Sequence, residues 1–268
     1  MSLRTAKPIS APKPTLVHNL YDRVQIAFSQ EIPSAQRIRF DAKNLCDTVT
    51  QRLLPFGVPF LADHNAAITS AIGDTKIVCL SGAYNAEIDE VAEYVARAKV
   101  LWAYAGPVTI ALAMAPAPKK FPFDRALTMQ DINSGVTYRD EGLIIIFRDD
   151  ADFWKVVMHE CIHLFCGERD EAITECKALL AHTMVNSTNW ADFQTKLGRQ
   201  LALSRANRSM LDRADAGATN AKRYWQLGED MLEHAESVLA GTFKPSKREP
   251  QVEWRVSLYG NVSGITAK

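Results

Sequence analysis

The sequence predicts an α+β protein in which a small β-sheet precedes a mainly helical C-terminal lobe. Two observations lead to this prediction. Short apolar runs rich in β-branched residues, typical of buried strands, lie between residues 76 and 147. After residue 149 the apolar residues recur at helical spacing, almost to residue 240. The 268-residue chain is long enough for one large domain or two lobes with a substantial core.

Three segments of the N-terminal half have the composition of buried strands, and they span residues 76–80, 107–115 and 143–147. The last run, Leu143-Ile144-Ile145-Ile146-Phe147, leads directly into a predicted helix. Within the extended stretch 131–138, Asn133-Ser134-Gly135 indicates a turn or a bulge. Residues 86–103 have the pattern of an amphipathic helix.

The central helix is predicted to follow Asp149, Asp150 and Asp152, whose carboxylates suit a helix N-terminus. Strongly apolar residues continue this helix until Gly167, a natural stop. Three more helices are predicted, over residues 169–185, 190–205 (after a cap at Asn189 or Ser187) and 218–240. Alternating apolar and polar residues over 252–258 predict one half-buried C-terminal strand.

The central helix contains the H-E-x-x-H motif His159-Glu160-Cys161-Ile162-His163. Residues four apart share a helix face, so His159 and His163 can offer imidazole nitrogens to one ion. Zn²⁺ accepts such nitrogens at about 2.0–2.1 Å and prefers four ligands, one of which is water in a catalytic site. Glu160 is the expected base for that water. The alternative is a helix whose histidines satisfy core polar groups, which is costly without partners.

The acidic residues after the motif offer a third ligand. Glu171 and Glu175 lie one turn apart on one face of the next predicted helix. With Glu171 as ligand, Glu175 can orient a liganding histidine from one turn behind. Glu168 and Asp170 are better explained as an acidic helix start that complements the helix dipole.

A family resemblance rests on Val156-Val157-Met158-His159-Glu160-Cys161-Ile162-His163 followed by Asp170-Glu171-Ala172-Ile173-Thr174-Glu175. Over about residues 143–182 the chain resembles the gluzincins, the thermolysin-like family of zinc metallopeptidases. The resemblance implies that His159, His163 and Glu171 bind zinc, that Glu160 is the catalytic base, and that Glu175 supports a liganding histidine. Glu175 stands where the family has aspartate, Asp170 stands where it has asparagine, and the segment between the motifs is shorter than in thermolysin-like enzymes.

The resemblance also implies a zincin-like fold, in which a small mixed sheet packs on the active-site helix. Its edge strand, near residues 131–138, would hold the substrate backbone by β-augmentation; an ordinary hairpin turn is the alternative. The pattern Asn133-Ser134-Gly135-x-Thr137 ahead of Lys155-Val156-x-x-His159 further resembles uncharacterised zincin-like proteins of large DNA viruses.

The sequence also has to be compared with two other kinds of metal site, a metzincin site and a site with a cysteine ligand. The metzincin motif needs a glycine at the position of Cys166 and a histidine at that of Arg169, so it fits poorly. A cysteine ligand is the main chemical rival to Glu171, and Cys166 lies nearer the required side than Cys161 does. Cys176 also lies close in sequence.

A peptidase also needs a donor for the oxyanion that forms when water attacks the carbonyl. Gluzincins use a histidine or tyrosine from later in the chain. The candidates here are Tyr224, His234 and His182, and Tyr224 is preferred.

Four segments are predicted: a flexible basic arm (1–15), an α/β N-terminal lobe (16–148), a helical lobe with the zinc site (149–240), and a linker with the C-terminal strand (241–268). The 31 basic and 31 acidic residues leave no net charge, which argues against a nucleic-acid partner. No apolar run reaches transmembrane length or forms a signal peptide. Five cysteines without a C-x-x-C fit a reduced, cytoplasmic compartment.

We therefore expect a zinc-dependent metallopeptidase that acts on a peptide or protein substrate without a membrane partner. The alternative is a catalytically inactive zincin-like protein with a structural or interaction role, for example in a viral particle.

Overall fold

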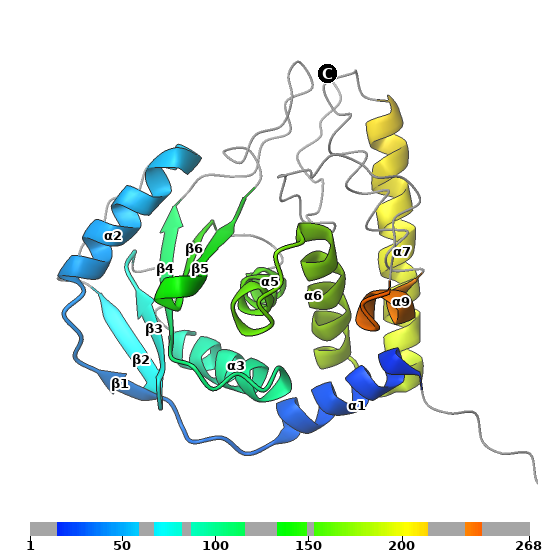
Figure 1. Ribbon diagram of the computed structural model, residues 1–268, viewed down its shortest axis with the longest axis horizontal. Coiled ribbons are helices and arrows are strands. Elements are labelled where there is room, and N and C mark those ends of the chain that lie inside the picture. The colour runs from blue at the N-terminus through cyan, green and yellow to red at the C-terminus, as the bar shows by residue number, and fades with distance from the viewer. Residues whose placement is uncertain are drawn as a thin grey trace, which may run out of the picture.

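The computed structural model describes residues 15–58, 67–81, 87–115, 133–148, 153–213 and 234–242. These residues form a six-stranded mixed β-sheet with helices on both of its faces (Figure 1), in agreement with the predicted α+β class. Helix α5 (Phe153–Phe165) lies in the middle of the view, between the sheet and helix α6 (Glu171–Val185).

The strand order of the sheet is β1-β2-β3-β4-β6-β5. The strands are β1 (Gln36–Ile38), β2 (Ile68–Ile72), β3 (Thr75–Cys79), β4 (Val108–Ala115), β5 (Gly135–Tyr138) and β6 (Leu143–Arg148). β4 is parallel to β3 and to β6, and the other pairs are antiparallel. Helix α3 (Ile88–Leu101) forms the crossover that joins the parallel strands β3 and β4. The three predicted strands are confirmed as β3, β4 and β6.

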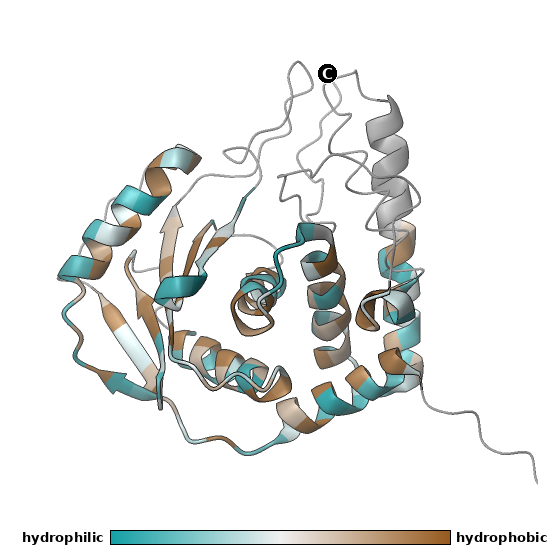
Figure 2. Ribbon diagram, viewed as in Figure 1, coloured by the Kyte–Doolittle hydropathy of each residue, from teal (hydrophilic) through white to brown (hydrophobic). Residues whose placement is uncertain are grey.

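Alternate residues of the central strands enter two separate hydrophobic clusters, as the two-residue period of a strand requires. Ile110 and Ile144 pack with helices α3, α5 and α6 on one face, whereas Ala111 and Ile145 pack with helix α2 (Lys43–Leu53) on the other. Figure 2 shows mainly apolar colours on the central strands and alternating colours along α2, which packs on its face together with Phe56 and Val58. The continuous apolar run of β6 is explained by burial on both faces.

The helices after the sheet extend the larger cluster. α5 packs against α3 and α6, and α6 packs against α7 (Trp190–Arg213). The first helix, α1 (Leu16–Ser29), contacts α3, α6 and α9 (Ala235–Leu239), so one core joins residues from both ends of the described chain. α5 is therefore packed between α3, α6 and the sheet, and all of its residues except Trp154 are buried, which gives a rigid base for any site on it.

Several sequence predictions differ from the structure. Helix α7 continues to Arg213, beyond the predicted end at 205. The predicted continuous helix 218–240 is wrong at His234, whose φ of −111° and ψ of 29° are not helical and which caps α9. The carboxylate of Glu236 accepts hydrogen bonds from the first backbone N–H groups of α1, so docking to α1 positions this short helix.

Other predictions fall outside the described residues: the arm over 1–14, the helix start at 149–152, most of the predicted helix, at 218–233, and the strand at 252–258. Among the described residues, the α-helices α1 and α2, the strands β1 and β2, and two short 3-10 helices at Leu54–Phe56 and Arg139–Glu141 have no counterpart among the predictions.

Candidate metal centre

Helix α5 carries His159, Glu160 and His163 in the middle of the protein. Its apolar residues anchor it between the sheet and α6, and the three polar side chains are buried with it. The chain leaves the helix at Gly167, whose φ of 65° lies in the left-handed region that favours glycine. This turn lets the chain return along α5 as α6.

Asp170 caps α6 and so determines where Glu171 lies. The backbone N–H of Ile173 donates to Asp170 Oδ1 at 3.0 Å, which makes Glu171 the first residue of the helix. Glu168 pairs with Lys177 at 2.9 Å and accepts from the N–H of Asp170. Both residues therefore support the turn between the helices, and of these three acidic residues it is Glu171 whose carboxylate lies against the two histidines.

Three side-chain atoms from α5 and α6 converge. His159 Nε2 and His163 Nε2 are 3.1 Å apart, and Glu171 Oε2 lies 3.3 Å from each of them. Four atoms arranged tetrahedrally at about 2.0–2.1 Å from a zinc ion are about 3.3 Å from one another. The three atoms thus have the spacing of three tetrahedral ligands, and they form a group that could hold a metal ion.

The other nitrogen of each imidazole has its own partner. His159 Nδ1 lies 2.8 Å from Glu175 Oε2, and His163 Nδ1 lies 2.8 Å from the carbonyl oxygen of Glu168. When these acceptors bind Nδ1–H, the lone pair of each Nε2 points at the shared position. Of the two neutral tautomers, the Nδ1–H form, which presents the Nε2 lone pair to a metal ion, is thereby favoured at both histidines.

Glu175 is also paired with Lys155, which lies one turn before His159 on α5. The Lys155 ammonium forms an ion pair with Glu175 Oε1, and each side chain is only 2% exposed. Burial acts to raise the pKa of Glu175, but the charge of Lys155 and the bond to His159 hold that pKa well below its usual range. Glu175 therefore stays ionised.

The pKa of His159 responds to the same surroundings. Burial acts to lower it, but hydrogen bonds with Glu171 and Glu175 outweigh burial and raise the pKa to about 9. The carboxylates of Glu171 and Glu175 thus favour positive charge at His159, one beside each ring nitrogen. A divalent cation beside Nε2 would supply the same positive charge.

Glu160 faces the edge strand β5. The Thr137 hydroxyl lies 2.6 Å from Glu160 Oε2, to which it donates, and 3.1 Å from the Glu160 carbonyl oxygen. Gly135 makes room for the carboxylate, because a Cβ there would lie 2.8 Å from Glu160 Cγ and 2.9 Å from Oε1. Glu160 is 2% exposed, so β5 both covers and orients it.

The charges around the centre suit a divalent cation. Lys155 supplies one positive charge. Of three carboxylates nearby, that of Glu171 lies against both histidines, that of Glu175 lies against His159, and that of Glu160 acts on His159 through its charge. With neutral histidines this group carries two net negative charges. A dication would neutralise them in a region where uncompensated charge is expensive.

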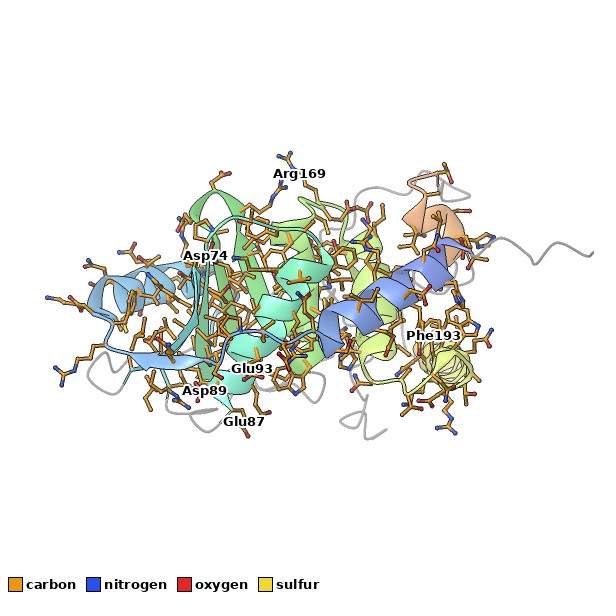
Figure 3. The ribbon with its side chains drawn as sticks, turned by 90° about the horizontal axis from the view of Figure 1, so that it is seen from below. Asp74, Glu87, Asp89, Glu93, Arg169 and Phe193 are labelled. Carbon is orange, nitrogen blue, oxygen red and sulfur yellow. The ribbon has the colours of Figure 1, made fainter. Side chains whose placement is uncertain are left out.

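None of the other candidates within the described residues belongs to this centre. Tyr224, the preferred oxyanion donor, lies outside the described residues. His182 on α6 lines a separate pocket with Tyr94 and Trp154, and His234 is exposed ahead of α9. The group that could hold a metal contains no cysteine among the described residues. Arg169 stands where the metzincin motif has a histidine ligand, and its side chain projects from the surface (Figure 3).

Sequence reasoning missed the roles of Lys155, Thr137 and Gly135. A lysine in an apolar helix, four residues before a predicted ligand, is a signal that could have been used, because it shares the face of His159. Thr137 and Gly135 lie on a strand and contact Glu160 on a helix. No local sequence pattern reveals such contacts.

Comparisons of the chain with protein-family models, curated proteins and solved structures found no match. Among the described residues, no helix is both long and apolar enough to cross a membrane.

Proposed function

We propose that this protein is a zinc-dependent metallopeptidase with a zincin-like fold. The observation that carries the proposal is the triangle of His159 Nε2, His163 Nε2 and Glu171 Oε2, whose sides of 3.1–3.3 Å match three corners of a zinc tetrahedron. Glu160, which a purely structural site would not need, is buried beside it.

The arrangement of strands around α5 supports the zincin-like fold. β5 is the edge of the described sheet, antiparallel to β6, and it lies against α5 at Glu160. An extended peptide lying along β5 would run past the candidate metal position. The substrate in this proposal is therefore a peptide bond in an extended segment.

Each residue of the centre has its own role in the proposed hydrolysis. A zinc ion held by His159, His163 and Glu171 would polarise the scissile carbonyl and lower the pKa of a bound water towards about 7. Glu160 takes the proton of the attacking water and passes it to the leaving amine. The hydrogen bond from Thr137 fixes the orientation of the Glu160 carboxylate, and the contact with Glu175 fixes the orientation of the His159 ring.

A second candidate is a zincin-like protein that binds metal but does not hydrolyse peptides. One observation favours it: of the three oxyanion-donor candidates, the two in the described part of the chain, His182 and His234, do not contact the centre. Such a protein would use the metal to hold α5 and α6 together.

Two measurements test the proposal. Metal analysis of the purified protein is expected to give one zinc per chain, and a peptide library is expected to be cleaved. Glu160→Gln is expected to retain zinc while hydrolysis falls by about 10²–10⁴-fold, because only the base is lost. Glu90→Gln, at an exposed carboxylate on α3, is the matched control and should leave both unchanged.

The outcomes separate the two candidates. Zinc binding without cleavage of any peptide would favour the non-enzymatic protein. Absence of zinc from protein refolded with excess zinc would overturn both, since each depends on the same three ligands.

A further inference from the structure

We infer that Lys155 is a positioning residue of the metal centre: it holds Glu175 in the orientation that aims His159 at the metal. This inference rests on the proposed function, because it assumes that His159 is a ligand. It assigns a role to a buried lysine that the H-E-x-x-H motif does not include.

The three residues form a chain of contacts in which each oxygen of Glu175 has a different partner. Lys155 binds Oε1, and Oε2 lies 2.8 Å from His159 Nδ1. Because Lys155 and His159 are one turn apart on α5, they approach the carboxylate from the same helix. The carboxylate is thus fixed at both oxygens, and the imidazole ring is fixed by the carboxylate.

The Lys155–Glu175 pair is hard to explain by stability alone. Both side chains are 2% exposed, and a buried ion pair is often no more stabilising than apolar residues of similar volume. His163, the other histidine of the centre, has its Nδ1 against a backbone carbonyl and needs no counterion. Of the two histidines, His159 is the one oriented by a carboxylate, and that carboxylate is paired with the buried Lys155. This difference links Lys155 to the orientation of His159.

Two effects of Lys155 on metal affinity have opposite signs. A positive charge near the site repels a dication, so loss of the charge alone would tighten zinc binding. If Lys155 instead orients Glu175, its loss frees the carboxylate to turn away from Nδ1, and zinc binding weakens. Loss of a partner that orients a metal ligand weakens metal affinity by about 10–100-fold. The direction of the change therefore separates positioning from simple electrostatics.

The test is the zinc affinity of full-length variants, measured with Zn²⁺ alone by competition with a chromophoric chelator. Lys155→Met is expected to bind zinc about 10–100-fold more weakly than the wild type, and Lys155→Arg to restore most of the loss because it keeps the ion pair. Lys99→Met is the matched control, since Lys99 is also buried and paired, with Asp74 near the outer surface (Figure 3). It is expected to lower stability without a change in zinc affinity.

Lys155→Met leaves Glu175 buried without its counterion, so a second variant removes both charges. Lys155→Met/Glu175→Gln keeps the shape of the pair, but its amide can present either an oxygen or a nitrogen to His159. It is also expected to bind zinc about 10–100-fold more weakly. Zinc affinity at or above the wild-type value in whichever of these two variants folds would overturn the inference. Failure of the wild type to bind zinc would instead overturn the proposed function.

Discussion

The hydroxyl of Thr137 on β5 lies 2.6 Å from Oε2 of Glu160 on α5, so the sheet edge and the central helix meet at the candidate base. Glu160 is 2% exposed, and this hydroxyl is a direct partner that sets the direction of its carboxylate. The base is therefore oriented by a residue on a different element, 23 positions earlier in the chain.

Thr137→Val should lower kcat about tenfold and leave zinc content unchanged. Valine keeps the shape of threonine but donates no hydrogen bond, so the carboxylate loses its fixed direction while the metal ligands are untouched. Steady-state hydrolysis of a peptide cleaved by the wild type measures the effect. Thr195→Val on the exposed side of α7 is the control. Unchanged kcat in Thr137→Val would show that Glu160 does not depend on this contact.

Gly135→Ala should displace Glu160 and cost about 1–3 kcal/mol of stability, because the new Cβ would lie 2.8 Å from Glu160 Cγ. Hydrolysis should fall with it. Gly198→Ala provides the opposite case: nothing lies within 4 Å of its Cβ position in α7, so the exchange should stabilise the protein by about 0.5–1 kcal/mol. Thermal and urea unfolding measure both. If both substitutions changed the free energy of unfolding in the same direction, the packing of Gly135 on Glu160 would be contradicted.

Zinc should raise the Tm of the wild type, because an ion that binds only the folded state stabilises it by mass action, by about 4 kcal/mol at a thousandfold excess over Kd. Glu171→Gln should lose most of this gain, since an amide is a weaker ligand than a carboxylate. Glu168→Gln, three residues earlier and directed at Lys177, should keep it. Equal zinc-dependent shifts in the two variants would rule out Glu171 as a ligand.

Stability should fall between about pH 6.5 and pH 4 in a way that depends on His182. Burial, with help from the charge of Lys155, lowers the pKa of His182 to about 4. The unfolded chain then takes up a proton below about pH 6.5 that the folded protein takes up only near pH 4, so acid favours unfolding by roughly 2–3 kcal/mol over this window. The charged side chains around the same pocket are those of Glu90, Glu93 and Arg97 on α3.

His182→Gln should flatten this part of the stability curve, and the difference between the two proteins in urea unfolding at pH 7 and pH 4.5 isolates the histidine. Identical pH profiles for wild type and variant would show that His182 titrates normally in the folded protein.

Local patterns were sufficient for the elements closest to the candidate centre. The apolar run of β6 and the helical spacing of α5 are strong signals, because β6 is buried on both faces and α5 on almost all sides. α1, α2 and β1 have exposed residues that weaken the pattern, and β1 is exposed along its whole length. β2 is largely buried, but its Thr69 and Ser70 interrupt the apolar run. The helix over 218–240 was predicted from periodicity alone, and the break at His234 depends on docking to α1.

By itself, the sequence determined that His159 and His163 share one helix face, because they are four residues apart in a predicted helix, and it favoured Glu171 as the third member of the group. The tertiary structure brought Glu171 to the two histidines, since Asp170 caps α6. Only the tertiary structure decided how those residues are held. Lys155 meets Glu175 between two helices, and Thr137 meets Glu160 between a strand and a helix. Such contacts join residues distant in the chain, and their geometry is set by packing rather than by any local preference.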